Sequence, residues 1–95
     1  MPNGIPTIEL LESTHNFPCR YVFKIIGKNV DDFPARVVTA MRKALGASVD
    51  PPHSLRHTAG GRHVSVTMEP VVTSPQQVVA AYGELHLTDD VVIIF

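Results

Sequence analysis

The sequence predicts an α+β domain of the ferredoxin-like, split β-α-β type, with a four-stranded antiparallel sheet and two helices on one face. An alternating apolar pattern at 20–26 is followed directly by an amphipathic helical pattern at 33–45. The same succession recurs at 63–68 and 74–85, and two shorter strand patterns complete the series. The expected element order is therefore β-α-β-β-α-β.

A leader precedes this domain. Residues 1–16 contain two prolines, a glycine and a short apolar cluster at Ile8, Leu10 and Leu11. We expect the start of the leader to be mobile and residues 8–11 to dock as a turn. Residues 17–95 then form a single domain.

The first strand begins after Phe17-Pro18 and alternates from Arg20 onwards. The larger side chains should face the core, and they are Tyr21, Phe23 and Ile25. The other set should face outwards and consists of Val22, Lys24 and Ile26. Residues 27–29, Gly-Lys-Asn, are expected to end the strand.

The first helix has clear start and stop signals. Asp31 or Asp32 can cap it, and Pro34 is tolerated only in a first turn. Gly46 suits the C-terminal stop. The apolar residues of its buried stripe recur every fourth position, at Phe33, Val37, Met41 and Leu45.

A hairpin is expected in the middle of the chain. Pro51-Pro52 excludes a central strand, so residues 54–58 read as a short edge strand, turned by Gly60-Gly61. The strand at 63–68 alternates, and its inward residues are Val64, Val66 and Met68. Its outward residues are His63, Ser65 and Thr67.

The second helix begins at Ser74-Pro75 and has a capping box completed by Gln77. Its buried stripe should consist of Val78, Ala81, Tyr82 and Leu85. Asp89-Asp90 then turns the chain into an apolar closing strand at 91–95.

Composition excludes several classes of protein. The net charge of −1 does not favour nucleic acid or an anionic membrane as a partner. One cysteine cannot form an internal disulfide. The N-terminus has no signal-peptide pattern, and no apolar run approaches the length of about 20 residues that spans a bilayer. We therefore expect a cytoplasmic protein.

Two motifs resemble a known family. Phe17-Pro18-x-x-Tyr21-x-Phe23-Lys24-x-x-Gly27 is similar to the opening strand of the YbeD-like proteins, small bacterial proteins of unassigned function. The stretch 58–67 resembles that family's glycine-turned hairpin, with His63 in place of the usual aromatic. The similarity covers roughly residues 10–95. It implies a ferredoxin-like fold, similar to small-molecule-binding regulatory domains, and implies no established activity, cofactor or catalytic residue.

No catalytic, metal-binding or cofactor-binding constellation is predicted. His53 and His57 would share a face only in a helix, which the preceding prolines disfavour. Cys19 lies beside Arg20, which lowers a thiol pKa, but no nearby motif supplies a base. An acylphosphatase-like enzyme would need an arginine and an amide cradle at the first strand-helix turn, where only Lys28 is present.

The first strand-helix turn is one candidate site. Helix N-terminal amides and Lys28 would receive a carboxylate or phosphate, with Gly27 and Asn29 shaping the turn. Any such junction needs a glycine and a cap, however, and Asp31 and Asp32 place negative charge beside the anion. The corresponding function is sensing of an amino acid or carboxylate, across a dimer.

The outward face of the sheet is the other candidate. It should carry Val22, Lys24, Ile26, His63, Ser65 and Thr67. None of these six is phenylalanine, tyrosine or tryptophan, so base stacking with RNA is not predicted. The face, or the edge of the closing strand, is available to a partner protein or to self-association. Alternatively, residues 8–11 of the leader cover part of it. The preferred function is a non-catalytic regulatory or interaction module.

Overall fold

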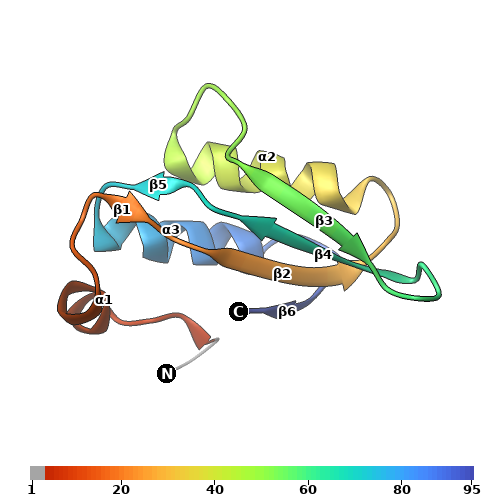
Figure 1. Ribbon diagram of the computed structural model, residues 1–95, viewed down its shortest axis with the longest axis horizontal. Helices are drawn as coiled ribbons and strands as arrows, with labels where there is room; N and C mark the ends of the chain where they lie inside the picture. Colours follow the sequence, from red (N-terminus) through yellow and green to blue (C-terminus); the bar gives the residue numbers. More distant parts are fainter. Residues whose placement is uncertain (1–3) are drawn as a thin grey trace.

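A computed structural model describes residues 4–95, and Figure 1 shows the arrangement of its elements. The predicted mobility of the first residues falls partly on 1–3, which lie outside the described residues. In chain order the elements are α1 (Ile8–Thr14), β1 (Cys19–Arg20), β2 (Phe23–Lys28), α2 (Phe33–Leu45), β3 (His53–His57), β4 (His63–Met68), β5 (Val71–Val72), α3 (Pro75–His86) and β6 (Val91–Ile94).

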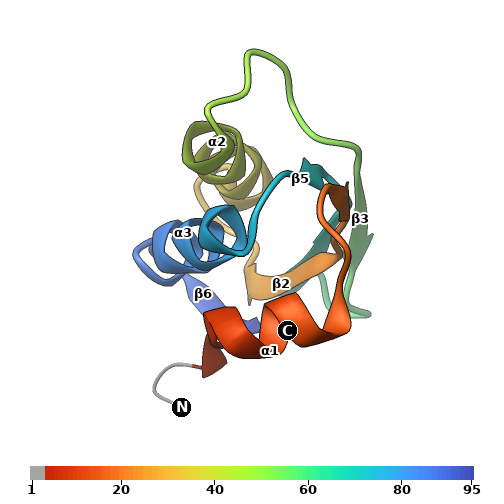
Figure 2. The ribbon, with the colours of Figure 1, turned by 90° about the vertical axis from the view of Figure 1, so that its left-hand side faces the viewer.

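The main sheet has four strands in the order β3-β4-β2-β6, and every neighbouring pair is antiparallel. Helices α2 and α3 lie side by side and cover one face of it (Figures 1 and 2). A second sheet pairs β1 with β5. The predicted mixed α+β architecture with antiparallel strands is therefore confirmed.

The number of elements differs from the prediction. Residues 4–95 contain six strands in two sheets and three helices, whereas four strands and two helices were expected. The expected first strand is divided at Tyr21-Val22, where the Tyr21 N–H donates to the Pro70 carbonyl at 3.0 Å. The strand also continues through Gly27 and Lys28, which were expected to end it, because Gly27 pairs with Val64 of β4 and Val91 of β6.

The core lies between the helices and the main sheet. Strand β2 buries Phe23, Ile25 and Gly27, and strand β4 buries every second residue, as the alternation predicted. The predicted stripe of α3 is confirmed in full, whereas Leu45 at the end of α2 is only partly buried. The largest fully buried side chains include Phe23, Phe33, Leu11, Ile25, Met41, Met68 and Leu85.

The helix ends follow the sequence signals in part. Gly46 ends α2 at φ 64°, the left-handed conformation that glycine adopts most easily. Asp32 precedes α2 but its side chain makes no capping hydrogen bond, because its backbone is itself left-handed, at φ 54°. Ser74 caps α3 by accepting from the Gln77 N–H at 3.2 Å. The Gln77 Oε1 accepts from the Thr73 N–H at 2.7 Å, so only half of the expected capping box forms.

The leader forms a helix where only a turn was expected. The Thr7 hydroxyl accepts from the Leu10 N–H at 3.1 Å and so caps α1. Leu11 is 1% exposed and belongs to the core. Helix α1 packs against α3 at the end of the molecule where β1 and β5 lie (Figure 1).

Candidate functional site

The face of the main sheet that points away from α2 and α3, here called the outer face, consists of two rows of aligned residues. Strand register places four residues of one row side by side from β3 to β6, and they are Arg56, Ser65, Ile26 and Ile93. The adjacent row consists of Ser54, Thr67, Lys24 and Phe95. Phe95 joins it because its N–H donates to the Lys24 carbonyl at 2.8 Å.

Both rows change in character across the sheet. Their β3 and β4 positions are polar or basic, whereas Ile26, Ile93 and Phe95 on the β2 and β6 side are apolar. Ile93 is 46% exposed and Phe95 is 59% exposed, so both keep much of their apolar surface in water. The outer face is therefore amphipathic, with an apolar half beside a polar half.

Phe95 is held in place from two sides. The Lys24 Nζ lies 5.6 Å from the centre of the Phe95 ring, in cation–π geometry. From the core, the Tyr82 hydroxyl donates to the Phe95 carbonyl oxygen at 3.2 Å. Burial, and then the hydroxyl of Tyr21 at 3.4 Å, raise the pKa of Tyr82 above its usual value. The Phe95 backbone is therefore fixed to the core through Tyr82, while the Phe95 ring stays exposed beside Lys24.

Charge on the strands is of one sign. The six strands contain no aspartate or glutamate, and their four cationic residues are Arg20, Lys24, Lys28 and Arg56. Among residues 4–95 the ion pairs are Arg36–Asp90 and Arg42–Asp50, so none of these four takes part in one. Carboxylates lie in helices and connecting segments instead. The strands of the outer face thus present basic groups without carboxylates of their own, and Glu69, which follows β4, brings a carboxylate to one end of this face.

A shallow hollow lies at one end of the outer face. It has a volume of about 270 Å³ and is lined by Ser54 and Thr67 together with Arg20, Pro52, His53 and Glu69. Arg20 and Glu69 bring opposite charges to it. The outer face is therefore not flat where β3 begins.

The predicted outward residues mostly come together here. Lys24, Ile26, Ser65 and Thr67 lie in the two rows, and His63 pairs with Lys28 in the next row. Val22 lies just before β2 and is 54% exposed. The sequence prediction missed Ser54, Arg56, Ile93 and Phe95. The uniformly apolar sequence of β6 and the uniformly exposed residues of β3 do not reveal which set of residues shares this face, and only the strand pairing shows it.

The first strand-helix turn is occupied by internal contacts. A Cβ on Gly27 would overlap the ring of Phe33, which is fully buried against it. The Asn29 side-chain amide donates to the Gly61 carbonyl at 3.0 Å, and its N–H donates to the Arg62 carbonyl at 2.9 Å. Gly27 and Asn29 therefore each have a structural role.

Arg36 joins this turn to the turn before β6. Its guanidinium donates to the carbonyls of Val30, Asp31 and Asp89 at 3.3, 2.9 and 3.2 Å, and to the Asp90 carboxylate at 2.7 Å. The Phe33 N–H donates to the Val30 carbonyl at 3.0 Å, and proline at 34 has no N–H. Few amides of α2 remain for an anion. The ligand site at Gly27, Lys28 and Asn29 stays a prediction.

The other chemically notable residues lie apart. Among residues 4–95 no three histidine, cysteine or carboxylate side chains are grouped so that they could hold a metal ion. The His53 Nδ1–H donates to the Pro51 carbonyl at 2.9 Å, and Cys19 is partly buried against the core. In the described part of the chain, no helix has both the length and the apolar character needed to cross a membrane.

Comparison with known proteins places the chain in a family. Residues 12–95 match the model of the family described as "Protein of unknown function (DUF493)". The chain belongs to this family. The resemblance to YbeD-like proteins is thereby confirmed.

The relatives are small bacterial proteins. The chain is 31% identical to a UPF0250 protein of Shewanella oneidensis over 77 residues, 81% of each chain. It is 32% identical to a UPF0250 protein of Chromobacterium violaceum over 69 residues, 73% of this chain and 78% of the relative. It is 28% identical to one of Idiomarina loihiensis over 76 residues, 80% of this chain and 84% of the relative. Their names state no activity, so the family's function is unknown.

Proposed function

We propose that this chain is a non-catalytic, cytoplasmic interaction module of the ferredoxin-like class that regulates a partner protein by binding it through the outer face. The strand order β3-β4-β2-β6, with α2 and α3 on one face, supports the class. In this proposal, α1 and the β1–β5 ribbon are additions at one end of the four-stranded unit.

The observation that carries the proposal is the apolar half of the outer face. Ile93 and Phe95 lie on the edge strand and just beyond it, half exposed, beside Ile26. Single exposed apolar residues are ordinary, but adjacent ones on an uncovered sheet face are typical of a binding surface. The described leader residues leave them about half exposed, and α1 packs against α3.

Sensing of a carboxylate at the first strand-helix turn is the alternative. The contacts of Gly27 and Asn29 explain those two residues without a ligand, and Asp31 and Asp32 oppose an anion. Lys28 is exposed and forms no ion pair among residues 4–95, but a single lysine is weak support for a ligand site. Protein binding is therefore the better-supported function.

Site-specific photocrosslinking in the native cell tests the proposal. A benzophenone amino acid replaces Phe95, whose ring it resembles, and in a control strain it replaces Leu87, which is 79% exposed at the end of α3. We expect one protein to crosslink at position 95 and not at 87. The purified partner should then bind the chain, and Ile93→Asp should weaken that binding at least about tenfold.

Two results would contradict the proposal. Equal crosslinking at both positions would mean that the outer face is not selective. Crosslinking only to a second copy of the chain, together with a dimer in analytical ultracentrifugation, would replace a partner protein by self-association through β6.

A further inference from the structure

We propose that the segment bound by the outer face is an acidic, amphipathic stretch of the partner. It lies along the strands, with its apolar side over β2 and β6 and its carboxylates over β3 and β4. This inference rests on the function proposed above and specifies the chemistry of the partner.

The apolar half sets the direction of the segment. Ile26 and Ile93 are paired across β2 and β6, and Phe95 follows one pair further along the same two strands. Successive pairs on one face of a sheet are separated by two residues, about 7 Å along the strand. Apolar residues two apart in an extended segment, or three to four apart in a helix, therefore fit along this half.

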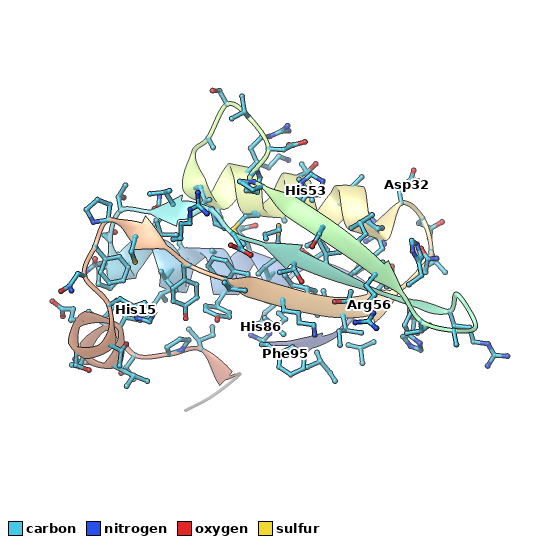
Figure 3. All side chains as sticks on the ribbon, viewed as in Figure 1. His15, Asp32, His53, Arg56, His86 and Phe95 are labelled. Atoms are coloured by element: carbon cyan, nitrogen blue, oxygen red, sulfur yellow. The ribbon has the colours of Figure 1, made fainter. Side chains whose placement is uncertain are left out.

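The polar half determines the sign of the partner's charge. Arg56 shares a row with Ser65 and Ile26, and His63 pairs with Lys28 one row further along. In Figure 3, Arg56 lies on β3 and Phe95 lies beyond β6, at opposite edges of the sheet. Since the strands carry no carboxylate, a partner's glutamates or aspartates are the groups that complement this half.

Lys24 connects the two halves. It shares a row with Phe95, and its ammonium lies 5.6 Å from the centre of the Phe95 ring. Long basic side chains often cover apolar surface in this way while the charge stays in water. A partner carboxylate beside the ring would pair with Lys24 without displacing it from Phe95.

Nucleic acid fits this face less well. Sheet surfaces of this class bind single strands by stacking two or three bases on exposed aromatic rings. The outer face has one phenylalanine, tyrosine or tryptophan ring, that of Phe95, and its Lys24 side is already occupied. The net charge of −1 also disfavours general attraction to phosphate. An acidic protein segment is therefore the better match.

Matched synthetic probes test the inference. Two amphipathic peptides of about 14 residues share the same leucine positions and carry either glutamate or glutamine at every polar position. Each is titrated into the isotope-labelled full chain and followed by amide chemical shifts, and a twelve-nucleotide thymidine strand serves as the third probe. We expect the glutamate peptide to shift amides of β2, β3, β4 and β6 and to bind about tenfold tighter than the glutamine peptide, with weaker binding at high salt.

Charge reversal gives the matched control. Arg56→Glu and Lys24→Glu should each weaken the glutamate peptide at least about threefold. Lys43→Glu makes the same change of charge on the exposed side of α2 and should leave that binding unchanged.

The outcomes separate the inference from the proposed function. Equal binding of both peptides at the outer face would overturn the acidic partner and leave a protein-binding face. Shifts confined to the helices, or no shifts, would also overturn the acidic partner, and the crosslinking experiment would then decide the proposed function separately. Tighter binding of the thymidine strand at the outer face would overturn both.

Discussion

The first strand-helix turn and the outer face are both built from β2, and they differ in where their polar groups find partners. At the turn, Asn29 and the neighbouring Arg36 donate to carbonyls and a carboxylate of the same chain. On the outer face, Arg56 and Lys28 have no ion-pair partner among residues 4–95. Hydrogen bonds within the chain stabilise a fold, whereas uncompensated charge beside exposed apolar surface is available to a partner.

A glycine or a basic residue at a strand-helix turn is therefore weak evidence for a bound ligand. Gly27 is explained by the ring of Phe33, and the guanidinium of Arg36 holds two turns together. Lys28, which forms no ion pair among residues 4–95, is the next residue along the same strand and lies on its opposite side.

The largest effect is expected at the turn. Gly27→Ala places a methyl group against the outer edge of the buried Phe33 ring, too close for the two to coexist without a shift, so it should lower the free energy of unfolding by about 3 kcal/mol in urea denaturation. Gly83→Ala is the control, because a Cβ there meets nothing within 4 Å and alanine favours the helix α3. The control should be neutral or slightly stabilising. A mild effect of Gly27→Ala would mean that Phe33 can move and that the turn has room for a ligand.

Substitution of Arg36 should cause the second largest loss of stability. Arg36→Gln removes most of the bonds that join the turn at 30–31 to that at 89–90, and we expect a loss of about 1–2 kcal/mol. This value already allows for the partial exposure of the Arg36–Asp90 pair. Lys43→Gln, a neutralisation elsewhere on α2, serves as the control and should cost almost nothing. Equal effects of the two would remove the contrast between the turn and the exposed surface.

The hydrogen bond from the Tyr82 hydroxyl to the Phe95 carbonyl should have the next largest effect on stability. Tyr82→Phe removes the hydroxyl that donates to the Phe95 carbonyl and should lower stability by about 1 kcal/mol. Because burial raises the pKa of Tyr82 in the folded state, its contribution is full below about pH 10 and is lost as the pH rises beyond the pKa of the unfolded chain. Wild type should therefore lose more stability than Tyr82→Phe above pH 10. Parallel pH profiles would show that the hydroxyl is already hydrated.

The smallest effects on stability are expected on the outer face itself. Arg56→Gln and Lys24→Gln should each change the free energy of unfolding by no more than about 0.5 kcal/mol, because both side chains are exposed and neither forms an ion pair. Thermal and urea denaturation of the two variants check this. A loss comparable to that of Arg36→Gln would show that these cations stabilise the fold, which would weaken their assignment to a partner.

Much of the fold was predictable because local patterns and tertiary packing agree. Ser74 and Gly46 mark helix ends through hydrogen bonds and backbone conformations that involve only near neighbours. The alternation in β2 and β4 predicted which residues are buried, since one face of the sheet packs on helices. The division at Tyr21-Val22 was not predictable, because the Tyr21 N–H bonds to Pro70, which lies between β4 and β5 and is distant in the chain.

The candidate surface was predictable only in its central part. The outward residues of β2 and β4 follow from alternation, and they lie in adjacent rows. Arg56 and Phe95 joined them only once the order and register of β3 and β6 were known.

The sequence by itself determined the α+β class, the boundaries of α2 and α3 and membership of a small bacterial family, because these depend on periodicity, capping and local motifs. Tertiary structure decided which side chains share the outer face, that α1 packs on α3, and that Gly27 lies against Phe33. Each of these is a contact between residues distant in the chain. Such contacts are selected by packing and strand pairing, which no local pattern encodes.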